Sequence, residues 1–422
     1  MTQLPKKFVL EPCESKDETN RFSASDDRTP EQLIRVLDPA TGNIWGFVVV
    51  DDTRRGPGLG GIRMAPDITL WEVRRLARAM TLKNSAANLP FGGGKAGIVC
   101  DPVEMARNPG MKRDLIGIFA EVLFSVEQYI PAPDMGTNEK DIQQIYEHYS
   151  ERLGTHQHMR GGASRLPDKG GIPIDEWGLT AHSLFAAVRT VEELEPDFKL
   201  KGAQVVIQGY GNVGSVTASK LSDVGVVITG VSDIHGALWH PHGLNVEELN
   251  TVRCEPGGIS NYSGQVEKRF GLDQIDWLLE MPCDILIPAA RPDAITARNA
   301  DRIQCRKIFQ GANTPSNKMT EYYLQNRRNI VSYSDFIVNV GGVMGCAVEL
   351  KMTMEPSYRE QVLLQGEDGK IYMERLITNT VSSNIRTLMS RLSDQKDGDR
   401  IFREEAQKLA QERLDHPDDI WL

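Results

Sequence analysis

The residues of this sequence that could do chemistry on a small molecule are two lysines and an aspartate, Lys83, Lys95 and Asp134. Lys83 lies in a stretch whose apolar residues repeat at three- and four-residue steps, so a helix would turn it toward the interior. Lys95 follows three consecutive glycines and Asp134 follows a proline, so compact or rigid backbone would hold both. A buried lysine loses hydration and is seldom kept without a partner or a task.

Each of these groups has a chemical use. The amine of Lys95 could act as a general base near neutral pH, because burial or a second ammonium nearby would lower its pKa. Lys83 could remain charged and bind a carboxylate, and Asp134 could accept a proton. Taken singly, each residue could also belong to a structural ion pair, but their joint occurrence favours a site. The glycine run is not a P-loop, because Leu89 and Ala96 stand where that motif has glycine and a hydroxyl residue.

The surrounding segments predict the elements that must position these groups. Thr69 and Glu72 form a capping box at the start of the helix that carries Lys83. The other expected elements are a strand at 44–50, a glycine-rich turn with positive φ angles at 54–61, a helix through 115–123, a rigid proline turn at 131–134 and an exposed loop at 154–171.

A second chemical signal is a glycine-rich motif, Gly209-Tyr210-Gly211-Asn212-Val213-Gly214, which follows a buried strand and opens a helix. Asp233 ends the next strand. Glycines let the backbone approach a pyrophosphate at a helix N-terminus, and the acid can accept from a ribose hydroxyl. Tight packing without a nucleotide is the alternative, but strand, helix, second strand and acid together favour a dinucleotide site. Asp233 would repel a 2′-phosphate, so the predicted cofactor is NAD, with NADP not excluded.

These motifs predict an α/β protein of two domains, a mixed α/β substrate domain and a doubly wound Rossmann-type nicotinamide-binding domain. The short apolar runs that follow the glycine motif are typical of a parallel sheet and lie at 226–231, 285–287, 307–309 and 330–332. The predicted bounds are 1–195 for the first segment of the substrate-binding and oligomerisation domain, 196–345 for the dinucleotide-binding domain, and 346–422 for C-terminal helices that return to the substrate domain.

The composition limits the partners of the chain. Its 422 residues are too many for one typical core, and a net charge of −10 without a long Lys/Arg run argues against nucleic acid. No apolar run approaches the ~20 residues of a membrane span, and the N-terminus lacks the apolar core of a secretion signal. The six cysteines are scattered, which fits a reducing cytoplasm. The histidine pairs at 156/158 and 240/242 lack a third ligand nearby, so no metal is predicted.

The same segments occur in the same order in a known family. The chain resembles the Glu/Leu/Phe/Val dehydrogenases, amino-acid dehydrogenases that include glutamate and leucine dehydrogenase, from about residue 31 to 350. The matching motifs are Gly58–Met64, Met80–Asn84, Leu89–Lys95, Pro131–Thr137, Gln208–Ser215, Gly311–Asn313 and Asn339–Val343. The resemblance implies reversible oxidative deamination of an amino acid to a 2-oxo acid and ammonia, with hydride passing to the nicotinamide.

The resemblance also implies roles for single residues. Lys83 would hold the substrate α-carboxylate, Lys95 would activate the water that attacks the imine, and Asp134 would exchange protons with the amino group. Asn313 and Asn339 would lie near the nicotinamide. Family members are commonly hexamers or octamers, so a homo-oligomer of one of these sizes is expected.

Two departures from the family bear on the substrate side chain. In glutamate dehydrogenases the position of Leu59 is usually a lysine and that of Cys346 a serine, both reaching the distal carboxylate. A pocket lined by Leu59, Ala132, Val343 and Cys346 offers that carboxylate no charged donor, and burying it unpaired is costly, so an apolar amino acid is predicted as substrate. The alternative is a glutamate dehydrogenase that binds glutamate through another residue, such as Arg63.

A rival prediction of another class is a catalytically inactive dinucleotide-binding regulator. Trp177 favours it, because the family commonly has a small residue or threonine there, near the cofactor. The presence of Lys83, Lys95 and Asp134 argues against it, and an NAD(P)-dependent amino-acid dehydrogenase remains the prediction.

Overall fold

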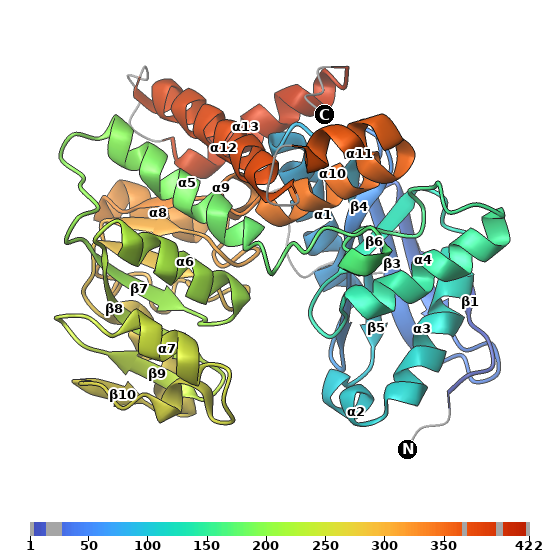
Figure 1. The fold of residues 1–422 in the computed structure, drawn as a ribbon, viewed down its shortest axis with the longest axis horizontal. Coiled ribbons are helices and arrows are strands. Elements are labelled where there is room, and N and C mark those ends of the chain that lie inside the picture. Colours follow the sequence, from blue (N-terminus) through green and yellow to red (C-terminus); the bar gives the residue numbers. More distant parts are fainter. Residues whose placement is uncertain (1–3, 14–27, 365–368, 394–399, 419–422) are drawn as a thin grey trace. The chain divides into compact units, whose positions relative to one another are not determined.

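The structure is a computed structural model that describes residues 4–13, 28–364, 369–393 and 400–418. The chain divides into two compact units, shown in Figure 1. Unit 1 comprises residues 1–174, 343–369 and 411–422, and unit 2 comprises residues 175–342 and 370–410.

Unit 1 is built on a six-stranded sheet with the order β1-β2-β3-β5-β4-β6. Strand β4 runs parallel to its neighbours β5 and β6, and the remaining pairs are antiparallel. The strands are β1 (Val9–Pro12), β2 (Gln32–Leu37), β3 (Ile44–Asp52), β4 (Gly58–Ala65), β5 (Gly92–Val99) and β6 (Tyr129–Pro133).

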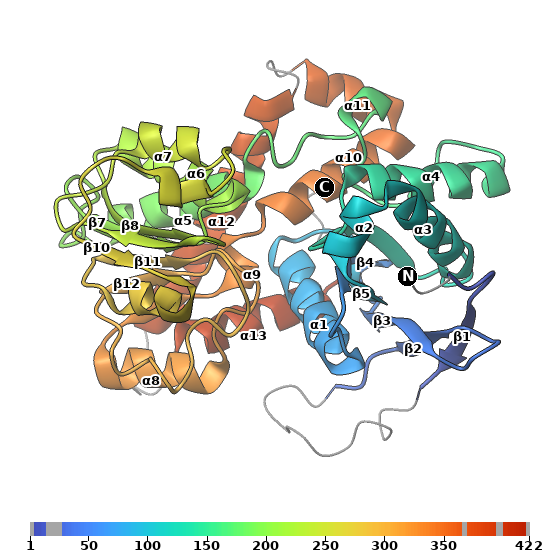
Figure 2. The same ribbon diagram turned by 90° about the horizontal axis from the view of Figure 1, so that it is seen from below.

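Helices cover both faces of this sheet (Figure 2). Helix α1 (Leu70–Ala86) covers one face, and the first turn is capped as predicted, because the Thr69 side chain accepts from the backbone N–H of Glu72 at 3.2 Å. Helices α3 (Pro109–Leu123) and α4 (Glu139–Leu153) pack on the other face around Phe119 and Ile142, and the short α2 (Pro102–Arg107) precedes them.

The prediction of a glycine-rich turn over residues 54–61 is wrong for most of that segment. Only Gly56 has a positive φ, +129°, and β4 already begins at Gly58. The glycines instead permit close approach between backbones, since a Cβ on Gly60 would lie 1.9 Å from the carbonyl oxygen of Gly94. Likewise a Cβ on Gly93 would lie 2.3 Å from the backbone nitrogen of Thr81, so α1 rests directly on β5.

Two further segments differ from their predicted form. The expected proline turn at 131–134 is largely strand β6, which tolerates prolines because it lies at the edge of the sheet. The expected exposed loop at 154–171 is irregular but partly buried, because Arg165 forms a buried ion pair with Glu349, with 3.0 Å between Nε and Oε1. The carboxylate of Glu349 also accepts from the backbone N–H of Ile172.

Unit 2 contains a seven-stranded sheet with the order β10-β9-β8-β7-β11-β12-β13. The five strands from β8 to β13 in this order are parallel, as predicted, and β9 and β10 extend the sheet in antiparallel fashion. The strands are β7 (Gln204–Gln208), β8 (Val227–Asp233), β9 (Gly236–Trp239), β10 (Lys268–Phe270), β11 (Ile285–Pro288), β12 (Lys307–Phe309) and β13 (Val331–Tyr333).

The chain order reverses between β7 and β11, because β8 lies on one side of β7 and β11 on the other. In open parallel sheets ligands bind at such a switch point, beyond the carboxyl ends of the strands. Helices lie on both faces of the sheet (Figure 2). The α-helices that begin between residues 175 and 340 are α5 (Leu179–Leu194), α6 (Asn212–Asp223), α7 (Val246–Val252), α8 (Lys318–Arg328) and the short α9 (Asp335–Val338).

The C-terminal part is helical as predicted, with α10 (Gly341–Met354), α11 (Pro356–Leu363), α12 (Lys370–Ser393) and α13 (Phe402–Asp415). Helix α12 packs along α5, where His182 contacts Thr378 and Thr190 contacts Ser382. Residues 370–410 therefore belong to compact unit 2 by their contacts, whereas the sequence assigned all C-terminal helices to the first domain. The functional domain bounds themselves stay a prediction.

Candidate active site

One face of the unit 1 sheet carries most of the predicted substrate and catalytic residues. Alternate residues of a strand point to the same face, and Gly93 and Gly97 of β5 lie against α1. Lys95, between them in this alternation, therefore points to the α1 face. The register pairs Leu59 of β4 with Gly93, so Leu59 points to that face as well.

The same reasoning places the neighbouring strand. Ala132 of β6 pairs with Gly61, which is two residues beyond Leu59 on β4. Asp134 follows just after the end of β6, and a Cβ on Gly61 would lie 2.8 Å from the Cβ of Asp134. A glycine at position 61 thus leaves room for the aspartate on the α1 face.

The structure brings Lys95 and Asp134 together in an ion pair between Nζ and Oδ2. The side chains of both residues are buried, with exposed fractions of 3% and 10%. The other carboxylate oxygen of Asp134 accepts from Nε of Arg63 at 3.1 Å and from the backbone N–H of Met135 at 2.6 Å. Arg63 in turn donates from Nη1 to Glu72 at 2.7 Å.

The backbone of Asp134 is also fixed. Its N–H donates to the hydroxyl oxygen of Thr137 at 3.0 Å, and that hydroxyl donates to the carbonyl of Ile62 at 2.7 Å. The backbone of Asp134 is therefore tied to β4 through the Thr137 hydroxyl.

The surroundings set the protonation of this pair. Burial lowers the pKa of the Lys95 amine from its usual value, against the attraction of Asp134, and the charge of Arg63 lowers it further. Burial alone would raise the pKa of the Asp134 carboxyl, but Lys95 and Arg63 outweigh it and hold that pKa well below its usual range. The lowered pKa of Lys95 is what a general base requires.

Lys83 and the predicted pocket residues all belong to unit 1. Lys83 is buried on α1, the helix that covers the face carrying Lys95. Leu59 is 1% exposed. Val343 and Cys346 lie on α10 at positions that share a helix face; Cys346 is buried and Val343 half-buried. Their roles, and a common pocket for them with Ala132, stay predictions.

In unit 2 the three glycines of the dinucleotide motif have distinct tasks. Gly209 turns with φ +96°, and a Cβ there would lie 2.8 Å from the carbonyl oxygen of Ala289 at the end of β11. A Cβ on Gly214 would lie 1.9 Å from the carbonyl of Gly209, so helix and strand pack closely there. A Cβ on Gly211 would meet nothing within 4 Å, which leaves an open approach to the backbone.

The start of α6 fits an anionic group. Gly211 occupies its N-cap position without a side-chain hydrogen bond, so Asn212 and Val213 begin a helix whose first N–H groups lack a side-chain cap. The amide of Asn212 donates to Asp175 at 3.1 Å. The three glycines and this N-terminus together have the features that a pyrophosphate needs.

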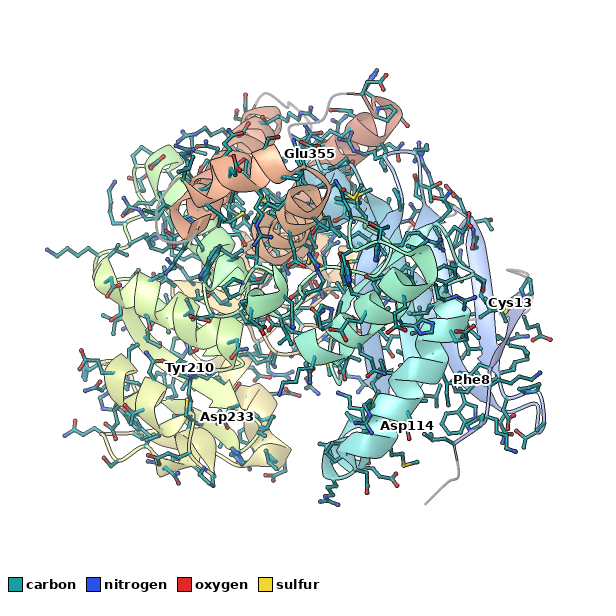
Figure 3. All side chains as sticks on the ribbon, turned by 45° about the vertical axis from the view of Figure 1, so that its right-hand side comes forward. Phe8, Cys13, Asp114, Tyr210, Asp233 and Glu355 are labelled. Atoms are coloured by element: carbon teal, nitrogen blue, oxygen red, sulfur yellow. The ribbon has the colours of Figure 1, made fainter. Side chains whose placement is uncertain are left out.

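Asp233 ends β8, and Figure 3 labels it together with Tyr210. Its Oδ1 accepts from the backbone N–H of His235 at 2.7 Å and its Oδ2 from that of Ile259 at 2.9 Å. These two bonds orient the carboxylate, and each oxygen keeps a second lone pair for a hydroxyl donor.

The two predicted asparagines lie after β12 and at the end of α9. Asn339 donates from Nδ2 to the carbonyl of Gly311 at 3.1 Å, while its buried Oδ1 has no partner within the part of the chain that the structure describes. Asn313 lies in the Gly311–Asn313 segment to which Asn339 is bonded. A buried acceptor without a partner costs stability, and a carboxamide N–H2 would satisfy it, so the residues present fit a nicotinamide dinucleotide.

Comparisons with known proteins agree with this geometry. Residues 170–396 match the family model described as Glutamate/Leucine/Phenylalanine/Valine dehydrogenase, and residues 30–151 match the Glu/Leu/Phe/Val dehydrogenase dimerisation domain. The chain belongs to this family. The predicted class, an NAD(P)-dependent amino-acid dehydrogenase of two-domain α/β fold, is thereby confirmed.

Similar proteins include several glutamate dehydrogenases. That of Thermotoga maritima is 36% identical over 74% of this chain and 73% of its own length. The NADP-specific glutamate dehydrogenase of Saccharolobus shibatae is 34% identical over 76% of this chain and 75% of its own. The crystal structure of the hetero-hexameric glutamate dehydrogenase from Thermus thermophilus in its Leu-bound form superposes with a TM-score of 0.74, at 24% identity, over 98% of this chain and 89% of that one.

Two other predictions touch the surroundings of the chain. The family model for residues 30–151 is a dimerisation domain, in line with the predicted self-association. Among the helices that the structure describes, none combines the length and apolar character needed to cross a membrane.

The sequence interpretation missed the place of Arg63 in this site. It considered Arg63 only as an alternative ligand for glutamate, and Glu72 only as a capping residue. The sequence did contain a sign of this contact. Leu59 and Arg63 are separated by an even number of positions on one strand, so their side chains point to the same face. Seeing it required β4 to be recognised as a strand.

Proposed function

We propose that this chain catalyses the reversible oxidative deamination of an L-amino acid with an apolar side chain, using NAD. The buried pair of Lys95 and Asp134 is the observation that carries the proposal. It sets a lysine with a lowered pKa beside a carboxylate, on a sheet face covered by the helix that bears Lys83. Glutamate dehydrogenase is the alternative reading of the same site.

In this proposal the protein's own groups perform the proton transfers. Lys83 binds the α-carboxylate of the substrate, and Asp134 accepts a proton from the amino group, which takes the place of Lys95 as its partner. The nicotinamide, when bound, accepts the hydride from Cα. Lys95, whose proton has passed to solvent, takes a proton from the water that attacks the imine carbon. Asp134 returns its proton to the nitrogen of the resulting carbinolamine, and the hydroxyl proton passes to solvent as ammonia leaves.

The preference for an apolar side chain rests on Leu59 and Arg63. Leu59 is 1% exposed and offers no charge. The guanidinium of Arg63 already contacts Asp134 and Glu72, so recruiting it for a distal carboxylate would break two ion pairs. The relatives named glutamate dehydrogenase keep glutamate as the alternative.

The preference for NAD rests on Asp233, whose negative charge repels a 2′-phosphate. Similar proteins include both kinds, an NADP-specific one from Saccharolobus shibatae and a catabolic NAD-specific one from Bacillus subtilis, which is 33% identical over 68% of this chain and 66% of its own length. We further propose a homo-hexamer or homo-octamer in the cytoplasm.

A panel of amino acids with NAD, and of 2-oxo acids with ammonia and NADH, tests the proposal through the absorbance of the reduced cofactor. We expect the highest kcat/KM with an apolar amino acid. A strong preference for glutamate establishes the alternative. A protein that binds NADH but turns over no member of either panel is the catalytically inactive regulator instead.

A further inference from the structure

Asp134 has two cationic partners with different chemistry. Lys95 contacts one carboxylate oxygen and Arg63 the other. An amine can lose its proton when burial lowers its pKa, whereas a guanidinium remains charged in proteins. The two partners are therefore not equivalent during a reaction that deprotonates the lysine.

Arg63 is fixed independently of Lys95. It is 5% exposed on β4, and its Nη1 donates to Glu72 in the first turn of α1, with 2.7 Å between the atoms. The carboxylate of Glu72 is partly exposed, so it holds the guanidinium from the solvent side. The bonds to Glu72 and Asp134 use two different edges of the planar group and so fix its orientation.

A deprotonated Lys95 could not hold Asp134 as an ion pair. Without another cation, the buried carboxylate would then have to take up a proton or turn away, because an unpaired buried charge is costly. The contact with Arg63 at 3.1 Å keeps a cation beside the carboxylate in this state.

We propose that Arg63 is a positioning residue for this reaction: it holds the Asp134 carboxylate in place and ionised while Lys95 gives up its proton, so that Asp134 can then accept the proton of the substrate amino group. This inference rests on the proposed deamination and deepens it. The positive charge of Arg63 also disfavours a proton on Lys95, so one residue serves both members of the pair.

The charged and titratable groups around the pair come from each element packed against it. They are Arg63 on β4, Glu72 and Lys83 on α1, and Tyr129 on β6, whose hydroxyl donates to the carbonyl of Gly60 at 2.8 Å. Burial raises the pKa of Tyr129 well above its usual value, so it stays neutral in the working range. Of these groups, Arg63 and Glu72 are the charges besides Asp134 that act on the Lys95 amine, so they can move the pH profile.

The experiment compares Arg63→Gln, which removes the charge, with Arg63→Lys, which keeps a positive charge but lacks the planar guanidinium that contacts two carboxylates at once. Lys112→Gln is the matched control, because Lys112 pairs with Asp141 at 2.6 Å with similarly low exposure on the opposite face of the same sheet. Thermal unfolding and NADH titration establish that each variant is folded and binds cofactor.

For Arg63→Gln we expect kcat to fall about tenfold or more, with little change in NADH affinity. Deamination needs neutral Lys95, so its rate rises with pH through the pKa of that amine. Removing the neighbouring cation raises this pKa, so the rising limb of kcat/KM shifts upward by about half a pH unit or more. Arg63→Lys should recover part of the rate and of the shift, and Lys112→Gln should show neither effect.

A purely structural role would lower activity without moving the pH profile, and an unchanged profile in Arg63→Gln overturns the inference. A second measurement does not depend on turnover: trace acetylation of Lys95 across pH, read by peptide mass spectrometry. If the wild type oxidises no amino acid, the proposed function fails, and the acetylation midpoint still decides the inference. A midpoint raised in Arg63→Gln supports it, and an unshifted midpoint refutes it.

Discussion

Gly214 lies so close to Gly209 that a Cβ on Gly214 would be only 1.9 Å from the carbonyl oxygen of Gly209. The turn after β7 and the first turn of α6 therefore fit together only with glycine at position 214. Gly211, between them, faces open space. The three glycines of one motif therefore answer to different physical demands.

We predict that Gly214→Ala and Gly211→Ala fail in different ways. Gly214→Ala should cost about 2 kcal/mol of unfolding free energy or more, because the methyl group must displace backbone. Gly211→Ala should unfold like the wild type but bind NADH about tenfold more weakly, because its Cβ stands where the pyrophosphate would approach the backbone. Thermal unfolding and NADH fluorescence separate the two effects. Equal loss of stability in both variants would contradict this division.

Position 59 should control substrate choice. In Leu59→Lys a buried ammonium lacks a partner unless the substrate brings a carboxylate, so kcat/KM should rise about tenfold for glutamate and fall for apolar amino acids. Leu59→Met, which conserves volume and polarity, is the control and should keep the apolar preference. The measurement is kcat/KM for both substrates. Unchanged selectivity in Leu59→Lys would show that Leu59 does not line the substrate pocket.

Asp233 should control cofactor choice. Asp233→Asn keeps the size and one acceptor for the N–H of Ile259 but removes the charge that repels a 2′-phosphate. We expect the ratio of kcat/KM for NAD to that for NADP to fall about tenfold. Steady-state kinetics with both cofactors measure it. A wild type that prefers NADP, or a ratio that does not move, argues against this role.

Gln310 should be essential to a buried polar network in unit 2. Its Nε2 donates to Glu321 at 2.6 Å, and its Oε1 accepts from Arg403 and from the backbone N–H of Asp335. Gln310→Glu would add a third carboxylate beside Glu321 and Asp335, which already share the guanidinium of Arg403, so unfolding free energy should drop by about 3 kcal/mol.

The pH dependence of Gln310→Glu has a definite sign. The pKa of the new carboxyl is raised in the folded state, so the loss of stability appears as pH rises above its unfolded value, about 4.3, and the variant recovers toward acidic pH. Gln325→Glu is the control, because Gln325 is only half-buried and its Oε1 serves simply as an acceptor for the N–H of Phe402. A deficit that does not depend on pH would contradict the charge argument.

The sequence was sufficient where local patterns decide the structure. The parallel strands of unit 2, the cap at Thr69 and the helix that buries Lys83 were predicted from periodicity and residue type. It was misleading where a glycine serves tertiary contact, as at Gly93, whose missing side chain admits the backbone of α1. Turn and close approach require the same residue, and one sequence does not separate them.

Long-range ion pairs were likewise beyond the sequence. The burial of the 154–171 loop depends on Arg165 meeting Glu349, which stands 184 positions later. The contact of Lys95 with Asp134 was expected only as convergence on a substrate, and the part of Arg63 in it was missed. Such pairings depend on strand order, which local propensity does not contain.

The central claim is that Lys95 serves the oxidation of an amino acid by a bound nicotinamide cofactor. The most direct measurement supplies an apolar amino acid deuterated at Cα to the wild type and to Lys95→Met, and follows deuterium into the reduced cofactor by mass spectrometry. The account predicts deuterated NADH with ammonia and a 2-oxo acid over many turnovers of the wild type. From a Lys95→Met variant that still binds NADH it predicts no ammonia or 2-oxo acid and at most one deuterated NADH per active site, because hydride transfer precedes the water attack that needs Lys95. Undiminished deuterium transfer by Lys95→Met would contradict it.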